Sequence, residues 1–248
     1  MELNFLVVTD SHEGYEELET IVEKSKPDIV LHAGDFSRGY DNLPSVWRQL
    51  EILEQLDKPI YWIPGNHDHN CFILHMNPLR EFPGNFCEYL SSKKFILLGD
   101  VAHEIVPGLF IAGLGGAPPS FVGDEERYYG KPYQTRTICN WVVRRVLHPQ
   151  LHMPGQYILL THFGPLGSNT SKCFDDGIES GNQGLADLLN ELHDTILVNF
   201  HGHQHCGKGI FDLEGVPVVN PGPSVFGKIK LNNNRWEIVE IKLLQNEH

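Results

Sequence analysis

Seven apolar runs of strand length restrict the fold of this chain more than any other feature of its sequence. Short continuous apolar segments bounded by polar and turn residues are typical of strands that are buried on both faces of a sheet. We therefore expect a sheet protein with a large buried core. The runs are Asn4–Thr9, Ile29–Ala33, Ile60–Ile63, Phe95–Leu98, Leu109–Leu114, Tyr157–Thr161 and Ile196–Phe200.

Helical patterns separate the early strands. Apolar residues recur at helical intervals in Tyr15–Lys26 and in Val46–Asp57, and such strand–helix alternation is typical of an α/β protein. From Gly209 to the end the pattern changes to short strands, which predict an antiparallel edge. Further helices are expected at Thr137–Leu147 and Gln183–His193, and turns at Glu214-Gly215 and Asn232-Asn233.

The whole chain, 1–248, is expected to form one domain. Its 248 residues, 41% of them hydrophobic, are enough to bury a substantial core, and the sequence has no internal repeat and no low-complexity linker. Two stretches, near 70–92 and 115–155, are rich in proline, glycine and aromatic residues. We interpret them as loop or cap insertions above a functional site.

Five short motifs of aspartate, asparagine and histidine follow the predicted strands. In an open α/β sheet, ligands gather outside the carboxyl ends of the strands, so these side chains should meet at one edge. Histidine nitrogen with aspartate and asparagine oxygen suits divalent ions such as Mn, Fe, Zn or Ni, and the motifs contain no cysteine pair for a structural zinc site. The candidate ligands are Asp10, His12, Asp35, Asn66, His162, His203 and His205. If two ions bind, one carboxylate must bridge them, and Asp35 is the natural candidate.

The ordered motifs D-x-H, G-D, G-N-H-D, T-H and G-H-x-H extend from Asp10 to His205. In this order they resemble the calcineurin-like metallophosphoesterase superfamily. The resemblance implies two mixed β-sheets packed face to face as a sandwich, with helices on the outside. It also implies a metal-dependent hydrolase that cleaves phosphate esters, as a phosphatase or a phosphodiesterase.

The resemblance further implies roles for individual residues. One metal would be held by Asp10, His12, Asp35 and His205, and the second by Asp35, Asn66, His162 and His203. A metal-bridging water or hydroxide would attack phosphorus. His67 would stand near the leaving oxygen or a phosphate oxygen as an acid or electrostatic stabiliser, and the adjacent Asp68 would orient it.

Several residues have two interpretations. His201 competes with His203 and His205 for two ligand positions, and the motif register leaves it as a packing residue that supports the ligands. Gly181 and Asn182 precede a predicted helix, where they could bind an anionic ester group or simply cap the helix. Arg38 could recognise the leaving group or form a surface salt bridge.

The net charge limits the kinds of partner that we expect, and the cysteine content predicts the cellular compartment. A formal net charge of −13 argues against long nucleic acid or a membrane surface as a partner. It does not exclude the small phosphoester or nucleotide-like substrate that the resemblance implies, because two bound ions would add positive charge at the site. The oligomeric state cannot be inferred from the sequence. The five cysteines are an odd set with no C-x-x-C pair and no secretory leader, which predicts reduced thiols and a cytoplasmic location.

Two other functions are compatible with the same motifs. A catalytically silent scaffold could keep the fold, although it would have no need for His12 and His67. A Ser/Thr protein phosphatase is disfavoured because Gly34–Gly39 is one residue short of that branch's G-D-x-x-D-R-G motif, with Arg38 where the orienting aspartate belongs.

Overall fold

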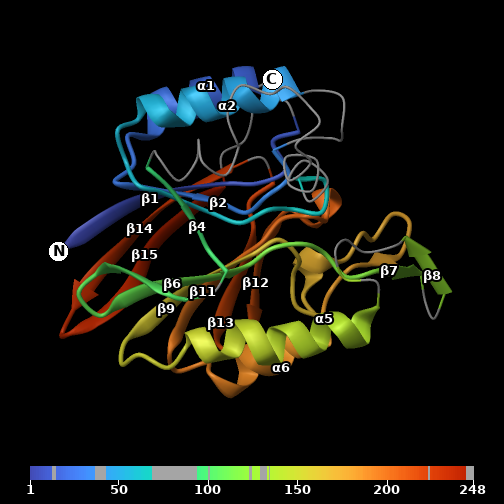
Figure 1. Ribbon diagram of the computed structural model, residues 1–248. Helices are drawn as coiled ribbons and strands as arrows, with labels where there is room; N and C mark the ends of the chain where they lie inside the picture. Colours follow the sequence, from blue (N-terminus) through green and yellow to red (C-terminus); the bar gives the residue numbers. More distant parts are fainter. Residues whose placement is uncertain are drawn as a thin grey trace, which may run out of the picture.

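The computed structural model describes residues 1–12, 15–36, 43–68, 94–99, 101–122, 125–128, 133, 135–222 and 224–243. Two six-stranded sheets pack face to face, and helices cover both outer faces (Figure 1). The predicted sandwich of mixed sheets is thus confirmed.

The first sheet has the strand order β15-β14-β1-β2-β3-β4. Its four early strands run parallel to one another, β14 runs antiparallel to β1, and β15 runs antiparallel to β14. The C-terminal hairpin therefore extends the sheet that the N-terminus begins. The strands are β1 (Glu2–Val8), β2 (Ile29–His32), β3 (Ile60–Trp62), β4 (Phe95–Leu97), β14 (Ser224–Asn232) and β15 (Arg235–Leu243).

The second sheet has the order β12-β13-β11-β9-β6-β5. The four inner strands are parallel and both edge strands are antiparallel to their neighbours. The carboxyl ends of the inner strands consequently share one edge, as the motif positions require. The strands are β5 (His103–Val106), β6 (Leu109–Leu114), β9 (Gln156–Thr161), β11 (Ile196–Phe200), β12 (Gly209–Leu213) and β13 (Val216–Asn220).

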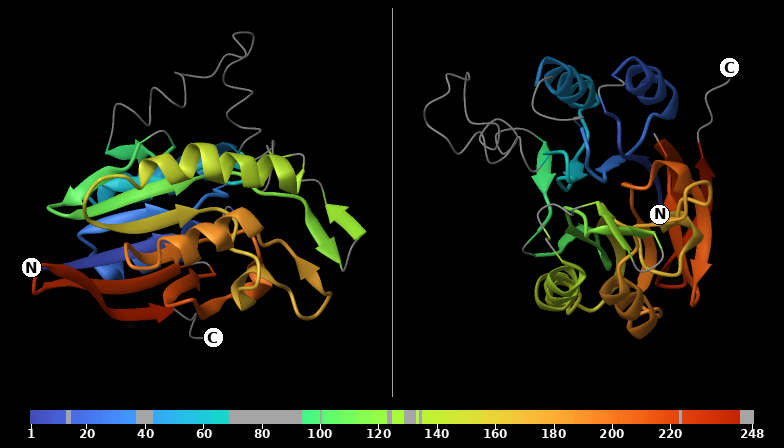
Figure 2. Two further views of the ribbon diagram at one scale, coloured as in Figure 1. Left: turned by 90° about the horizontal axis from the view of Figure 1, so that it is seen from below. Right: turned by 90° about the vertical axis from the view of Figure 1, so that its right-hand side faces the viewer.

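The main core lies between the two sheets, where Phe5, Leu31, Ile111, Leu160 and Phe200 are buried together. Two further clusters of buried apolar residues lie between the sheets and the helices. Figure 2 shows these helices on the outer faces of the sandwich. The helices are α1 (Tyr15–Ser25) and α2 (Leu43–Gln55) over the first sheet, and α5 (Arg136–Val142) and α6 (Gln183–Glu191) over the second. All four overlap the helices expected from the sequence.

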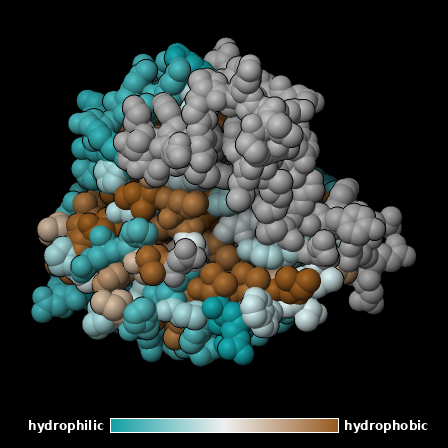
Figure 3. Space-filling view, in the orientation of Figure 1, coloured by the Kyte–Doolittle hydropathy of each residue, from teal (hydrophilic) through white to brown (hydrophobic). Residues whose placement is uncertain are grey.

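On one side of the sandwich, the apolar core between the two sheets is exposed at the surface. Figure 3 shows apolar side chains gathered in a band between the two helical layers, over the side where β4 and β6 run in Figure 1. Ile96 of β4, with Ile105 and Val106 of β5, is only partly buried while packing against the main core. The core thus reaches the surface between the two sheets.

The two expected insertions have different outcomes. The stretch near 70–92 lies outside the described residues. From the described part of 115–155, two strands, β7 and β8, pair with the later strand β10 in a small sheet of order β10-β7-β8, and α5 packs on the second sheet as part of the core. This sheet consists of β7 (Ser120–Val122), β8 (Glu125–Tyr128) and β10 (Ile178–Glu179).

The cysteine prediction is wrong for one pair, because Cys173 and Cys206 form a disulfide with their Cα atoms 5.4 Å apart. The two residues are 33 positions apart and follow different strands, so no local pattern indicates their proximity. The expected cytoplasmic location rested on reduced thiols, and the disulfide removes that support. Among the described residues, no helix has both the length and the apolar character needed to cross a membrane.

Candidate metal centre

The candidate ligands lie in loops that follow β1, β2 and β3 of the first sheet and β9 and β11 of the second. Backbone hydrogen bonds join these loops in pairs. The N–H of Asp10 donates to the Gly34 carbonyl oxygen, that of His12 to Asp35, and that of Gly202 to His162. The site therefore spans both sheets at the ends of their parallel strands.

Four candidate ligands have left-handed backbone conformations: Asp10 (φ 49°), His12 (φ 37°), Asp35 (φ 56°) and His203 (φ 66°). This conformation is unfavourable for residues with a Cβ, and it persists only where the surrounding structure imposes it. Such strain collects at functional sites because it aims side chains that relaxed turns would direct elsewhere.

The motif glycines have a steric explanation. A Cβ at Gly34 would clash with the backbone of Gly65, since the loops after β2 and β3 touch there. A Cβ at Gly202 would clash with the side chains of Thr9 and Asp10. Glycine is therefore required for the loops to approach one another closely.

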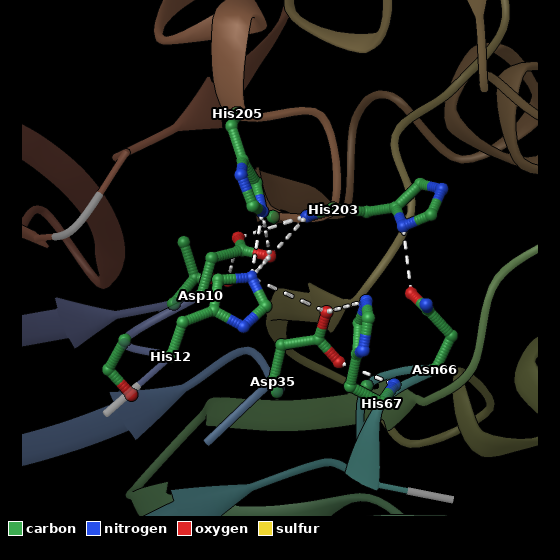
Figure 4. Close-up of polar contacts among 12 residues, drawn as sticks. Asp10, His12, Asp35, Asn66, His67, His203 and His205 are labelled. Atoms are coloured by element: carbon green, nitrogen blue, oxygen red, sulfur yellow. Dashed lines mark hydrogen bonds and ion pairs between the residues drawn. The ribbon is translucent and has the colours of Figure 1, made fainter. Parts of the chain in front are cut away.

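One set of donor atoms, the first donor group, comes from Asp10, His12 and His205, with Asp35 beside them (Figure 4). The Nε2 atoms of His12 and His205 are 2.9 Å apart, and His205 Nε2 is 3.3 Å from Asp10 Oδ1. His12 Nε2 is 3.9 Å from both Asp10 Oδ1 and Asp35 Oδ2. These lone pairs converge on one point.

The second donor group comes from Asp35, Asn66, His162 and His203. Asn66 Oδ1 is 2.9 Å from His162 Nε2 and 2.8 Å from His203 Nδ1, a contact visible in Figure 4. His162 Nε2 is also 3.3 Å from Asp35 Oδ2. Asp35 Oδ2 therefore faces both groups.

Comparison with known proteins identifies the family. The sequence model described as calcineurin-like phosphoesterase matches residues 3–207, which is most of the chain. The chain belongs to the calcineurin-like phosphoesterase family. The superfamily resemblance seen in the motifs is thereby confirmed.

Solved structures share this fold. A dimetal phosphatase from Danio rerio superposes with a TM-score of 0.62 at 11% identity, covering 98% of this chain and 97% of that one. The protein TT1561 of Thermus thermophilus gives a TM-score of 0.62 at 16% identity, covering 96% of this chain and 98% of that one. Phosphopantetheinyl hydrolase (PptH) from Mycobacterium tuberculosis gives 0.60 at 16%, covering 88% of each chain. At such identities the likeness shows the fold alone, and none of the curated protein sequences compared with this chain matches it.

Calcineurin-like phosphoesterases use divalent metal ions, and the residues of this chain fit such ions. The donor set is imidazole nitrogen with carboxylate and amide oxygen, as borderline divalent ions prefer. The His162 ring is already oriented for binding, because its Nδ1–H donates to the Ala33 carbonyl oxygen at 2.7 Å. This bond directs the other nitrogen toward Asp35 and Asn66, as the outer partner of a metal-binding histidine does.

The two carboxylates of the centre are ionised although they are largely buried. Burial alone would raise the pKa of Asp10 and Asp35, but the charge of His162 and hydrogen bonds to histidines hold both well below their ordinary value. Burial would lower the pKa of His162, yet the Asp35 carboxylate raises it to about 9. Burial lowers the pKa of His203 to about 3. The centre thus holds two ionised carboxylates, and in the metal-free protein the protonated His162 ring partly offsets their charge.

His67 and Asp68 occupy different environments. The His67 backbone N–H donates to Asp35 Oδ1 at 2.8 Å, and its Nε2 is 4.0 Å from Asp35 Oδ2, with the side chain 43% exposed. Asp68 is buried, and its Oδ2 accepts from the N–H groups of Asp35 (2.6 Å) and Gly65 (2.9 Å). These bonds make Asp68 a clamp between the loops that carry Asp35 and Asn66. Its orientation of His67 stays a prediction.

His201 lies outside both donor groups. Its Nδ1–H donates to the Gly202 carbonyl oxygen at 3.0 Å, and its Nε2 is 2.8 Å from Thr170 Oγ1. Burial lowers the pKa of His201 to about 4, so the ring is neutral. This supporting role matches the motif register.

Gly181 and Asn182 form a helix cap. The Gly181 N–H donates to Glu179 Oε1 at 2.6 Å and the Asn182 N–H to the Gly164 carbonyl oxygen at 3.0 Å. Asn182 Oδ1 accepts from the Leu185 N–H at the start of α6. Since both N–H groups are used within the chain, the capping interpretation replaces the anion-binding one. Arg38 lies outside the described residues.

Thr9 contacts a candidate ligand in a way that the sequence did not reveal. Its hydroxyl donates to Asp10 Oδ2 at 2.8 Å, while the His203 N–H lies 3.0 Å from the same oxygen. These two donors fix the Asp10 carboxylate so that Oδ1 faces His205. A threonine at a strand end is too common to have signalled this role.

Proposed function

We propose that this protein hydrolyses phosphoesters at a dinuclear metal centre. The observation that carries the proposal is the position of Asp35 Oδ2, which is 3.9 Å from His12 Nε2 and 3.3 Å from His162 Nε2. A single carboxylate oxygen facing two donor groups is suited to bridge two ions. One ion would bind Asp10, His12, Asp35 and His205, and the other Asp35, Asn66, His162 and His203.

The ions, when bound, would lower the pKa of water and neutralise phosphoryl oxygens. The chain supplies the remaining functions. Asp68 and Thr9 hold Asp35 and Asp10 in place, so that the ligands need little reorganisation. His67 would donate its proton from the imidazole to the leaving oxygen, a role supported by its partial exposure beside Asp35.

We propose a small or nucleotide-like phosphoester as the substrate. The net charge of −13 disfavours attraction of a long polyanion, and bound ions would supply the local positive charge that attracts a phosphate. A monoester and a diester would both fit this chemistry.

The test uses metal-stripped protein resupplied separately with Mn, Ni, Zn, Fe and Mg. Hydrolysis of p-nitrophenyl phosphate and bis-p-nitrophenyl phosphate is then measured, together with the number of bound ions. We expect turnover that requires two ions per chain, and the ratio of the two rates separates phosphatase from diesterase. Two bound ions without turnover on either ester or on a phosphopeptide would favour the silent scaffold instead.

A further inference from the structure

The disulfide lies directly beside a metal ligand. Cys206 follows His205 in the chain, and both belong to the short 3-10 turn His205–Gly207. Cys173 ends the segment Ser168–Cys173, which contains a second 3-10 turn, Asn169–Ser171. The bond therefore ties the turn that carries His205 to a neighbouring loop.

His205 is the least enclosed of the candidate ligands whose side-chain exposure can be compared. Its side chain is 58% exposed, whereas those of Asp10 and His12 are 8% exposed and that of His162 is fully buried. A buried ligand is held by the atoms packed around it. His205 lacks much of that packing, so its position depends on the backbone turn beneath it.

That turn rests on the neighbouring loop. Gly207 lies so close to the Thr170 carbonyl oxygen that any Cβ at this position would clash with it. The Asn220 amide donates to the carbonyl oxygens of Gln204 (2.7 Å) and Thr170 (3.2 Å) and so joins the two segments. These contacts are noncovalent, and the disulfide is the covalent bond that keeps the segments together.

His203, two residues earlier, is held differently. Its backbone N–H donates to both carboxylate oxygens of Asp10, and its ring contacts Asn66. His203, and with it the second donor group, is therefore held by contacts within the centre and does not depend on the turn. Loosening the turn would affect the first donor group selectively.

We propose that the Cys173–Cys206 disulfide is a positioning element for His205. Reduction of the disulfide then lowers the affinity for the ion held by Asp10, His12 and His205, while the other ion stays bound. The inference rests on the proposed dinuclear centre. It makes the occupancy of one metal site, and hence turnover, dependent on the thiol redox state.

The reduction needs a dithiol as co-reactant. Cys206 is exposed and Cys173 is buried, so a reagent thiolate attacks the Cys206 sulfur and Cys173 leaves as a thiolate that takes up a proton. The second thiol of the reagent then displaces Cys206. The S–S bond of the protein is broken, two thiols form, and the reagent is oxidised to its cyclic disulfide.

The test compares Mn²⁺ binding by oxidised protein and by protein reduced with dithiothreitol and then freed of reagent under anaerobic conditions. Mn²⁺ is chosen because it prefers oxygen and imidazole over thiolate, so the released thiols do not replace the lost ligand. Titration of thiols verifies reduction. We expect one of two Mn²⁺ affinities to fall about 10–100-fold and the spin-coupled paramagnetic resonance signal to become that of a single ion.

The double variant Cys173→Ser/Cys206→Ser is the matched control. It should bind Mn²⁺ as the reduced protein does and should not respond to dithiothreitol, although Cys71, Cys87 and Cys139 are still present. Circular dichroism verifies that it is folded, and reoxidation of the wild type should restore both affinities.

Two results would overturn the inference. Unchanged affinities for both ions after verified reduction would show that the disulfide does not position His205. An oxidised protein that binds only one Mn²⁺ would overturn the dinuclear centre itself, and this inference with it.

Discussion

The Nδ1 atom of His162 lies 2.7 Å from the carbonyl oxygen of Ala33, so the loop after β9 in one sheet is bonded to the end of β2 in the other. The bond crosses between the two sheets directly at the metal centre. It sets the direction of the ring, because Nδ1–H donates and Nε2 is left to face Asp35. The packing of the sheets and the geometry of the centre are therefore linked.

Metal binding should release a proton. In the metal-free protein the Asp35 carboxylate raises the pKa of His162 to about 9, although burial opposes this, so the ring is protonated at pH 7.5. An ion must displace that proton, and its apparent affinity should rise about tenfold per pH unit until the pH reaches about 9. Calorimetric titrations at pH 7.5 in two buffers of different ionisation enthalpy measure the release. Equal heats in both buffers would contradict it.

Replacing His67 with alanine should separate catalysis from metal binding. The side chain stands beside Asp35 without belonging to either donor group, so both ions should remain bound while turnover falls roughly 10²–10⁴-fold. The measurements are the metal content and the hydrolysis rate. His193→Ala, an exposed histidine beyond the end of α6, serves as the control and should keep full activity. Full turnover in the His67 variant would remove this residue from the mechanism.

Asp35→Asn should lower the affinity of the protein for both ions. The bridging oxygen would become a neutral amide, and the loss of affinity should exceed the roughly 10–100-fold typical of an outer partner. Metal analysis after dialysis measures this effect, with Asp194→Asn, whose side chain is 85% exposed, as the control. If only one ion is lost, Asp35 does not bridge.

Gly202→Ala should damage the centre through sterics alone. The new methyl group would clash with Thr9 and Asp10, so it should displace the carboxylate and lower metal affinity and turnover together. Gly99→Ala is the matched control, because a Cβ there meets no atom within 4 Å. A Gly202 variant that binds metal normally would show that the loops carrying Gly202 and Asp10 can move apart without loss of metal affinity.

Local patterns located the elements of this protein. Apolar runs predicted β1, β2, β3, β4, β6, β9 and β11, and helical periodicity predicted α1 and α2, because burial of a face imposes its period on the sequence. The helices α5 and α6 were also expected from the sequence. The C-terminal hairpin was only partly predicted. Its strands β14 and β15 have nine residues each and extend the N-terminal sheet, a pairing across more than 200 residues that no local pattern contains.

The sequence by itself determined the candidate metal ligands, since the motifs place aspartate, asparagine and histidine where strands end. Only the tertiary structure gives the distances within the two donor groups, with Asp35 Oδ2 facing both of them and Asp68 clamping the loops. It likewise decided that Cys173 bonds to Cys206, against the sequence expectation, and that Gly181 and Asn182 cap a helix. The physical reason is that residue type is a local property, whereas distances between loops depend on how two sheets pack.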